Sequence, residues 1–169
     1  MAAKTYTVLN GVVPGAAAAT AITTGTAIKT MLQLATSANT AIRVVEWWTE
    51  FDGSAAATPI KVEMLGHTGG PQTTLTTYAA ADIAKTNDPN AAASDLSLAS
   101  NASGFGTAAT EVTPTTVRNL STQFVPPTSG VYIQYPLGRE PEIPVSAYLR
   151  HRTTAGAAVN CFAGVVFEA

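Results

Sequence analysis

The feature that most constrains this fold is a strict two-residue alternation of apolar and polar side chains. From Ile60 to Met64 the apolar residues alternate with Lys61 and Glu63. Successive side chains of a β-strand point to opposite faces, so this pattern is typical of a strand with one buried face. The segment from Thr58 to Gly66 is therefore predicted to be a half-buried strand.

The preceding segment, AIRVVEWWTEFDG from Ala41 to Gly53, fits two periodicities. Its largest apolar residues have helical spacing, but most of its residues are β-branched or aromatic types that favour strands. Asp52-Gly53 is a turn signal. We therefore predict a strand that pairs with Thr58–Gly66 in a β-hairpin. Its predicted buried face carries Val45, Trp47 and Phe51, and its predicted wet face carries Glu46, Trp48, Glu50 and Asp52.

Strand signals recur along most of the chain, without the spacing of β-α-β units. The further candidates are 5–10 (a short strand or an extended arm), 26–35, 116–125, 131–135, 143–152 and 157–167. Turns rich in Pro and Gly separate the last four. The sequence thus predicts an all-β protein, an antiparallel β-sandwich or jelly-roll of about seven to eight strands. The last strand is apolar on both faces, so we expect it to be central or covered.

Two segments are low in large apolar residues and stand apart from this pattern. Residues 1–25 are predicted to form an N-terminal extended arm, and residues 26–169 a single β-sandwich domain with a long loop insertion at 67–114. A short helix is possible near residues 78–85. A loop of this length is unusual inside a compact domain and is commonly functional. We expect the arm and the loop to contact another chain.

Composition excludes several classes of function. Only 12% of the residues are charged and the net charge is -2, so the chain lacks the basic surface that nucleic-acid binding needs. No run approaches the ~18 consecutive apolar residues of a membrane span, and the N-terminus lacks the apolar core of a signal peptide. We expect synthesis in the cytoplasm. The single cysteine, Cys161, is expected to be a buried small hydrophobe.

No catalytic, cofactor or metal motif is present in the sequence. His67 and His151 lack partners at metal-ligand spacing, and Arg150 and Arg152 flank the second histidine. Two glutamates four residues apart on a strand would be about 13 Å apart, beyond the separation that glycoside hydrolysis uses. We therefore expect no enzymatic activity and no cofactor.

The run from Phe124 to Pro144, FVPPTSGVYIQYPLGREPEIP, precedes a further strand and the terminal segment VNCFAGVVFEA. Together with KTMLQLAT and VVEWWTEFDGSAAATPIKVEML, this order resembles the capsid decoration proteins of tailed phages, also called head auxiliary or cement proteins. The resemblance implies a β-sandwich subunit on the outer surface of the virion head. It also implies a homo-oligomer, commonly a trimer, that binds and stabilises the major capsid protein.

The resemblance transfers no individual contact residue, so candidate interface residues come from chemistry. Arg139, Glu140 and Glu142 form the densest charge cluster, and they are either a polar contact to a partner or a solvated loop. Trp48 is the fourth candidate. It is either an exposed binding residue or covered by a loop or a neighbouring subunit.

A different class of function also fits the pattern. The chain is alternatively a receptor-binding or carbohydrate-binding β-sandwich module of a phage tail or fibre. In that case aromatic side chains would stack on the apolar faces of sugar rings. The candidates are Trp48, Tyr78, Tyr132 and Tyr148.

Overall fold

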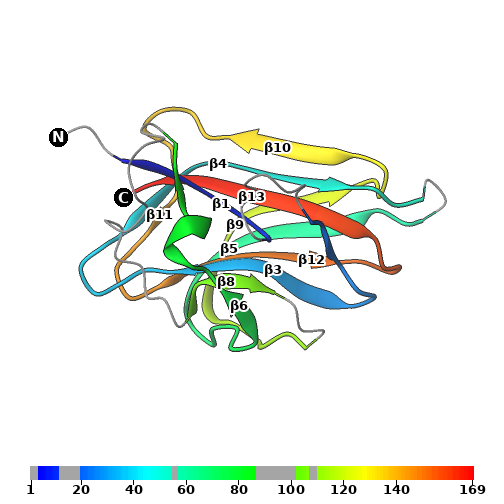
Figure 1. Ribbon diagram of the computed structural model, residues 1–169, viewed down its shortest axis with the longest axis horizontal. Helices are drawn as coiled ribbons and strands as arrows, with labels where there is room; N and C mark the ends of the chain where they lie inside the picture. The colour runs from blue at the N-terminus through cyan, green and yellow to red at the C-terminus, as the bar shows by residue number, and fades with distance from the viewer. Residues whose placement is uncertain (1–3, 12–19, 55–56, 87–101, 107–109) are drawn as a thin grey trace.

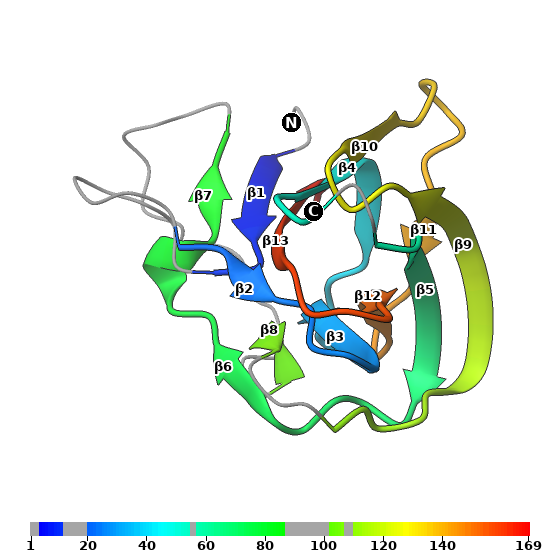
Figure 2. The same ribbon diagram turned by 90° about the vertical axis from the view of Figure 1, so that its right-hand side faces the viewer.

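The computed structural model describes residues 4–11, 20–54, 57–86, 102–106 and 110–169. In these residues the chain forms two antiparallel sheets that pack face to face, as Figures 1 and 2 show. The predicted all-β sandwich is confirmed. The helical periodicity of the tryptophan segment is overridden, because Ile42–Phe51 is a strand that pairs on both sides.

Each sheet combines long strands with short ones of two or three residues. Sheet A has the order β10 (Gly130–Gln134), β4 (Ile42–Phe51), β13 (Asn160–Glu168), β1 (Thr5–Leu9) and β7 (Ala84–Lys85), with β11 (Glu142–Ile143) beside β4 and β2 (Ile22–Thr23) beside β13. Sheet B has the order β6 (Leu75–Thr77), β8 (Gly104–Gly106), β3 (Ile28–Ala35), β12 (Tyr148–Thr154), β5 (Ile60–Gly69) and β9 (Thr115–Val125). A 3-10 helix, η1, covers Ala80–Asp82, inside the segment where a short helix was expected.

The eight longest strands of the described residues pair in a nested order. β1 pairs with β13, β3 with β12, β4 with β10, and β5 with β9. The first half of the chain therefore runs antiparallel to the second half, as one long hairpin rolled into two sheets. This arrangement is the jelly-roll, which occurs in viral capsid and lectin domains.

The core lies between the two sheets and is built from both. Trp47 of β4 is its largest fully buried side chain, and Tyr6 of β1 stacks on Phe167 of β13 with ring centroids 5.7 Å apart. Cys161 is fully buried, as expected. β13 lies between β4 and β1, which confirms that the doubly apolar last strand is central.

The predicted hairpin between the tryptophan strand and its successor is wrong. β4 pairs with β10, β11 and β13 in sheet A, whereas β5 pairs with β9 and β12 in sheet B. The chain crosses from one sheet to the other through residues 52–59. Alternation shows that each strand has one buried face, but it does not show which strand lies beside it.

The predicted faces of β4 hold for only part of the strand. Trp47 and Phe51 are buried as expected, but Val44 is fully buried in place of Val45. The register with β13 shifts between Val166 and Phe167, so Val45 has no paired residue on β13. Such a bulge inserts one residue and turns the preceding side chains to the opposite face.

The boundaries predicted for the arm and the loop also change. Thr5–Leu9 is a strand inside sheet A, with Tyr6 and Val8 in the core, so the strand alternative holds for these residues and the arm does not. The segment 67–114 contributes β6, β7 and β8, and it places Tyr78, Ile83 and Phe105 in the core. Ile22–Thr23 of the predicted arm also pairs with β13. The parts of these predictions at 1–3, 12–19, 87–101 and 107–109 lie outside the described residues.

The predicted strand over 143–152 is two strands. β11 ends at Ile143 and β12 begins at Tyr148 in the other sheet, with Pro144 and a positive φ of 56° at Ser146 between them. Val145 is consequently exposed, whereas Ala147 and Leu149 are buried.

Candidate binding surfaces

The structure separates the four residues predicted to form an interface. Trp48 lies in the middle of β4 on the outer face of sheet A, whereas Arg139, Glu140 and Glu142 lie between β10 and the end of β11. That segment meets β4 where the amide of Val44 donates to the carbonyl of Pro141 at 2.9 Å. Four strand residues, or about 13 Å, separate this point from Trp48. Two surfaces have to be considered.

The first surface is at the end of the sandwich where β10 ends and β11 lies. The amide of Arg139 donates to the carbonyl of Pro136 at 2.9 Å and closes a turn that has Gly138 at a φ of 80°. This turn holds Leu137 in solvent, with 94% of its surface exposed. Arg118 Nη2 donates to the carbonyl of Glu142 at 2.6 Å and joins β9 to β11.

We call this surface the end face. It carries apolar and charged side chains close together. Val117 and Val145 are each nearly half exposed, at 47% and 46%. Its members are Val117, Arg118, Leu137, Arg139, Glu142 and Val145. Glu140 lies beside it and is partly buried. The charge cluster predicted from the sequence therefore belongs to a surface that also has exposed apolar residues.

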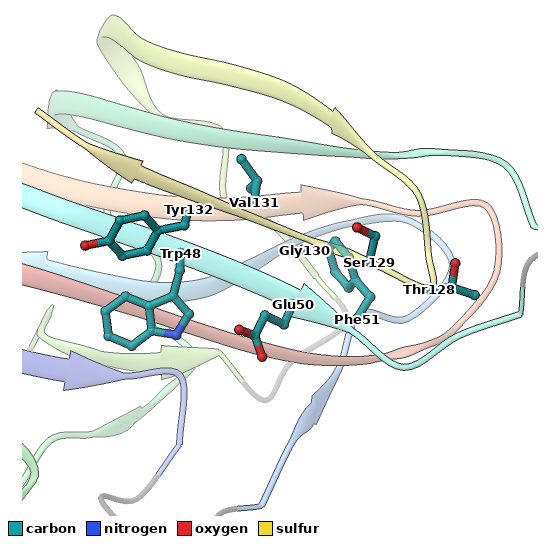
Figure 3. A pocket seen from close by; sticks show the side chains of 8 residues that line it. All are labelled: Trp48, Glu50, Phe51, Thr128, Ser129, Gly130, Val131 and Tyr132. Atoms are coloured by element: carbon teal, nitrogen blue, oxygen red, sulfur yellow. The ribbon is translucent and has the colours of Figure 1, made fainter.

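The second surface is a shallow groove on the outer face of sheet A. Figure 3 shows Trp48, Glu50 and Tyr132 extending from the same side of β4 and β10. Its volume is about 720 Å³, and its lining residues are Trp48, Glu50, Phe51, Thr128, Ser129, Gly130, Val131 and Tyr132. We call it the Trp48 groove.

Two glycines shape the Trp48 groove. Gly130 lies opposite Glu50 in the ladder, and a Cβ there would be 2.9 Å from Glu50 Cγ, so the floor is open only because residue 130 has no side chain. Gly164 lies opposite Trp48 on β13. A Cβ on Gly164 would be 2.2–2.7 Å from three indole atoms, so the six-membered ring lies over this glycine.

Tyr132 is the cross-strand neighbour of Trp48 and forms the wall of the groove. It is 58% exposed, and its hydroxyl donates to Glu46 Oε2 on β4. This hydrogen bond to a carboxylate raises the pKa of the Tyr132 phenol. The bond holds the ring beside the indole.

The other two aromatic candidates lie outside the Trp48 groove. Tyr78 is buried, and burial raises the pKa of its hydroxyl well above the ordinary value. Tyr148 stacks on His67, with ring centroids 5.0 Å apart. Only Trp48 and Tyr132 therefore share an accessible face. Trp48 and Tyr132 differ from the other two aromatic candidates because they are cross-strand neighbours. The alternation of side chains along the sequence does not reveal this pairing.

The outer face of sheet B carries a polar cluster that residues 70–72 and 110–112 cover. The side chain of Arg150 is fully buried in this cluster. It donates to Glu111 Oε1 at 2.9 Å, to Gln33 Oε1 at 2.9 and 3.1 Å, and to the carbonyls of Gly70 and Val112. Burial lowers the pKa of Arg150, and the charge of Glu111 opposes that effect. This cluster anchors a loop and leaves Arg150 no access to a ligand.

The two histidines lie on opposite faces of sheet B. His67 is on the outer face, where its Nδ1 is 2.9 Å from the carbonyl of Gly69. His151 points into the core, 2.6 Å from Thr49 Oγ1 of the opposite sheet. In the described part of the chain, no three His, Cys, Asp or Glu side chains gather closely enough to hold a metal ion.

Comparison with protein-family models, with curated proteins and with solved structures returned no match for this chain. None of the helices in the described ranges is long and apolar enough to cross a membrane. The surfaces described above therefore provide the structural basis for a functional proposal.

Proposed function

We propose that this protein is a virion structural protein, a decoration or cement protein that binds the major capsid protein on the outer surface of a phage head. The resemblance of the sequence to this class names the partner. The structure supports the proposal through the end face, which includes part of one of the segments that carry that resemblance. The segment Tyr135–Glu142 forms one border of this surface.

The observation that carries the proposal is the exposure of Leu137. A leucine that is 94% exposed on a hydrogen-bonded turn contributes nothing to this chain's own core. Burying such a side chain in an interface stabilises the complex by about 1.5–3 kcal/mol. Arg139 lies two residues further and offers a bidentate hydrogen bond to a carboxylate. Exposed apolar side chains beside polar groups are a common feature of protein interfaces.

The assembly that we propose is a homotrimer. One end face offers few apolar contacts, so a single copy would bind weakly. A symmetric oligomer presents the same surface several times, and linked contacts raise the overall affinity without any new contact. The low charge content of the chain is consistent with a subunit that is partly covered in an assembly.

The test is reconstitution on phage heads that lack the protein. Purified protein is mixed with heads, and bound protein is measured by sedimentation, together with the temperature at which packaged DNA is released. We expect stoichiometric binding at symmetric positions and a higher release temperature. Failure to bind any form of the head would overturn the proposal.

Two variants connect the result to the end face. Leu137→Asp should reduce occupancy at least tenfold, because it places a charge in the apolar contact. Phe124→Asp is the matched control, since Phe124 is 71% exposed but lies six residues, or about 20 Å, along β9 from Arg118. Equal binding by both variants would exclude the end face as the contact.

A further inference from the structure

We propose that the Trp48 groove is a carbohydrate-binding site for a neutral oligosaccharide. One sugar ring would stack on the indole of Trp48, and its hydroxyl groups would donate to the carboxylate of Glu50. This inference goes beyond capsid decoration, because the groove and the end face are different surfaces of the molecule.

The first argument is the orientation of the indole. The backbone of Gly164 covers one face of the six-membered ring, so this ring lies along the sheet and presents its opposite face outward. A flat aromatic surface with one covered face is a stacking platform. It matches the apolar face of a sugar ring, where several C–H groups lie side by side. Tyr132 extends the platform on the neighbouring strand.

The second argument is the position of polar groups around the platform. Glu50 is exposed and lies two residues beyond Trp48 on the same face, about 7 Å along the strand. A carboxylate accepts hydrogen bonds through two oxygens and can take both from neighbouring hydroxyls. Ser129 and Thr128 offer hydroxyls that donate and accept at the other end of the groove. Few, fixed polar groups beside an apolar surface are typical of ligand sites.

The third argument concerns charge and size. The eight lining residues named above for the described chain include one carboxylate and no basic side chain, which disfavours sialylated, sulfated or phosphorylated ligands. The volume of about 720 Å³ is within the usual range for small-molecule sites. A single ammonium group would also be attracted to Trp48 and Glu50. It would fill little of the groove and would leave Ser129 and Thr128 without a partner.

The Trp48 groove is open on the side of β10, and a sugar can enter from that side. β10 is an edge strand that pairs only with β4, so no strand of the described chain closes that side. Figure 3 shows the groove on the surface of these two strands. Both ends of a bound oligosaccharide can extend out of the groove. We therefore expect the groove to bind an internal sugar unit of an oligosaccharide as well as a terminal unit.

The experiment begins with an array that contains neutral and anionic oligosaccharides together with trimethyl-lysine peptides. Ligands that bind are then titrated by calorimetry and by tryptophan fluorescence. Trp47 is fully buried, so a change of emission on binding reports Trp48. We expect binding of neutral sugars, with a fluorescence change that Trp48→Ala abolishes.

Variants test each part of the site. Trp48→Ala should weaken binding at least tenfold, and Glu50→Gln and Tyr132→Ala several-fold. Gly164→Ala keeps the indole but forces it off the sheet, so it should also weaken binding. Phe124→Ala is the matched control, an exposed aromatic outside the groove that should bind normally. The urea midpoint of each variant shows that it is folded.

Three results would overturn the proposal. They are the absence of any glycan binding at millimolar concentration, binding that Trp48→Ala and Glu50→Gln leave unchanged, and binding of the trimethyl-lysine peptides alone. The outcome is separable from capsid decoration. Leu137→Asp should bind sugar normally, and Trp48→Ala should bind heads normally.

Discussion

Arg150 is a positively charged side chain that is buried away from water. Its side chain has no exposed surface, and its ion pair with Glu111 is 2.9 Å long. A buried pair of this kind adds little net stability over an apolar replacement, but removing one partner leaves an uncompensated charge. The carboxylate of Glu111 is therefore needed to keep the loop at 110–112 closed over sheet B.

We predict that Glu111→Gln lowers the free energy of unfolding by about 3 kcal/mol. Urea denaturation followed by circular dichroism measures the change. Glu142→Gln is the matched control, because Glu142 is exposed and its loss should leave the midpoint unchanged. If the two variants have equal midpoints, the buried ion pair does not stabilise the fold.

His151 is the second residue whose environment determines its chemistry. It lies in the core beside Trp47 and Thr49, and burial lowers its pKa from 6.5 to about 3. The unfolded chain takes up a proton near pH 6.5, whereas the folded chain resists it. The contribution of this group to stability is therefore complete above pH 6.5 and is lost as the pH falls towards 3.

We predict that the wild-type protein loses about 2 to 3 kcal/mol more stability than His151→Gln between pH 6.5 and pH 4.5. Urea midpoints at both pH values measure the difference. Because all other titrating groups are common to the two proteins, their effects cancel in the comparison. Parallel pH profiles would show that His151 accepts a proton in the folded state.

Among the elements, β1 shows how weak alternation leaves a sequence prediction open. Its five residues alternate weakly, and it was expected to be part of an arm or a short strand. In the structure it pairs with β13 on one side and β7 on the other. Val8 is fully buried, whereas its neighbour Thr7 points outward.

We predict that Val8→Asp unfolds the protein or destabilises it by several kcal/mol, because a carboxylate would enter the core without a partner. Thr7→Asp, one residue away on the outer face, should change the thermal midpoint by only a few degrees. Thermal melts followed by near-ultraviolet circular dichroism compare the two. A tolerated Val8→Asp would mean that β1 is not part of the core in solution.

Most strands were predictable because a half-buried strand needs alternating side chains. The pairing partners of the strands were not predictable. The alternation in β4 and β5 indicates a buried face but does not indicate the neighbouring strand. The bulge at Val45 was hidden for a related reason, because it depends on the register of β13. Sequence periodicity reports burial, whereas pairing is decided by the whole chain.

The candidate sites likewise combine residues that the sequence indicates with residues whose role depends on strand pairing. Trp48 and the Arg139 cluster could be chosen from residue chemistry. The glycines at 130 and 164 could not, because their effect depends on the side chain opposite them in the ladder. The burial of Arg150 could not be predicted either, because part of its cover comes from a segment about 40 residues earlier in the chain.

At the scale of the whole molecule, the nested pairing sets the folding rate. Every ladder between two long strands of sheets A and B joins the first half of the chain to the second half. Closing such distant contacts costs chain entropy before packing compensates for it.

We predict that refolding takes roughly milliseconds to seconds, as in other all-β domains, and not microseconds. Stopped-flow dilution from urea measures it, with the fluorescence of buried Trp47 as the signal in a Trp48→Phe variant. A microsecond phase that carries the full amplitude would contradict the dominance of distant contacts.

The nested order also brings the two ends of the described chain together. Thr5 lies opposite Glu168, and the amide of Ala169 donates to the carbonyl of Lys4 at 3.1 Å. A force that pulls these ends apart acts across β1 and β13, along the direction of their hydrogen bonds. The bonds then break one at a time, as in a zipper, whereas a pull along the strands would strain them all at once. The jelly-roll is therefore expected to unfold at a low force when it is pulled from its ends. It should resist a higher force when it is pulled along its strands.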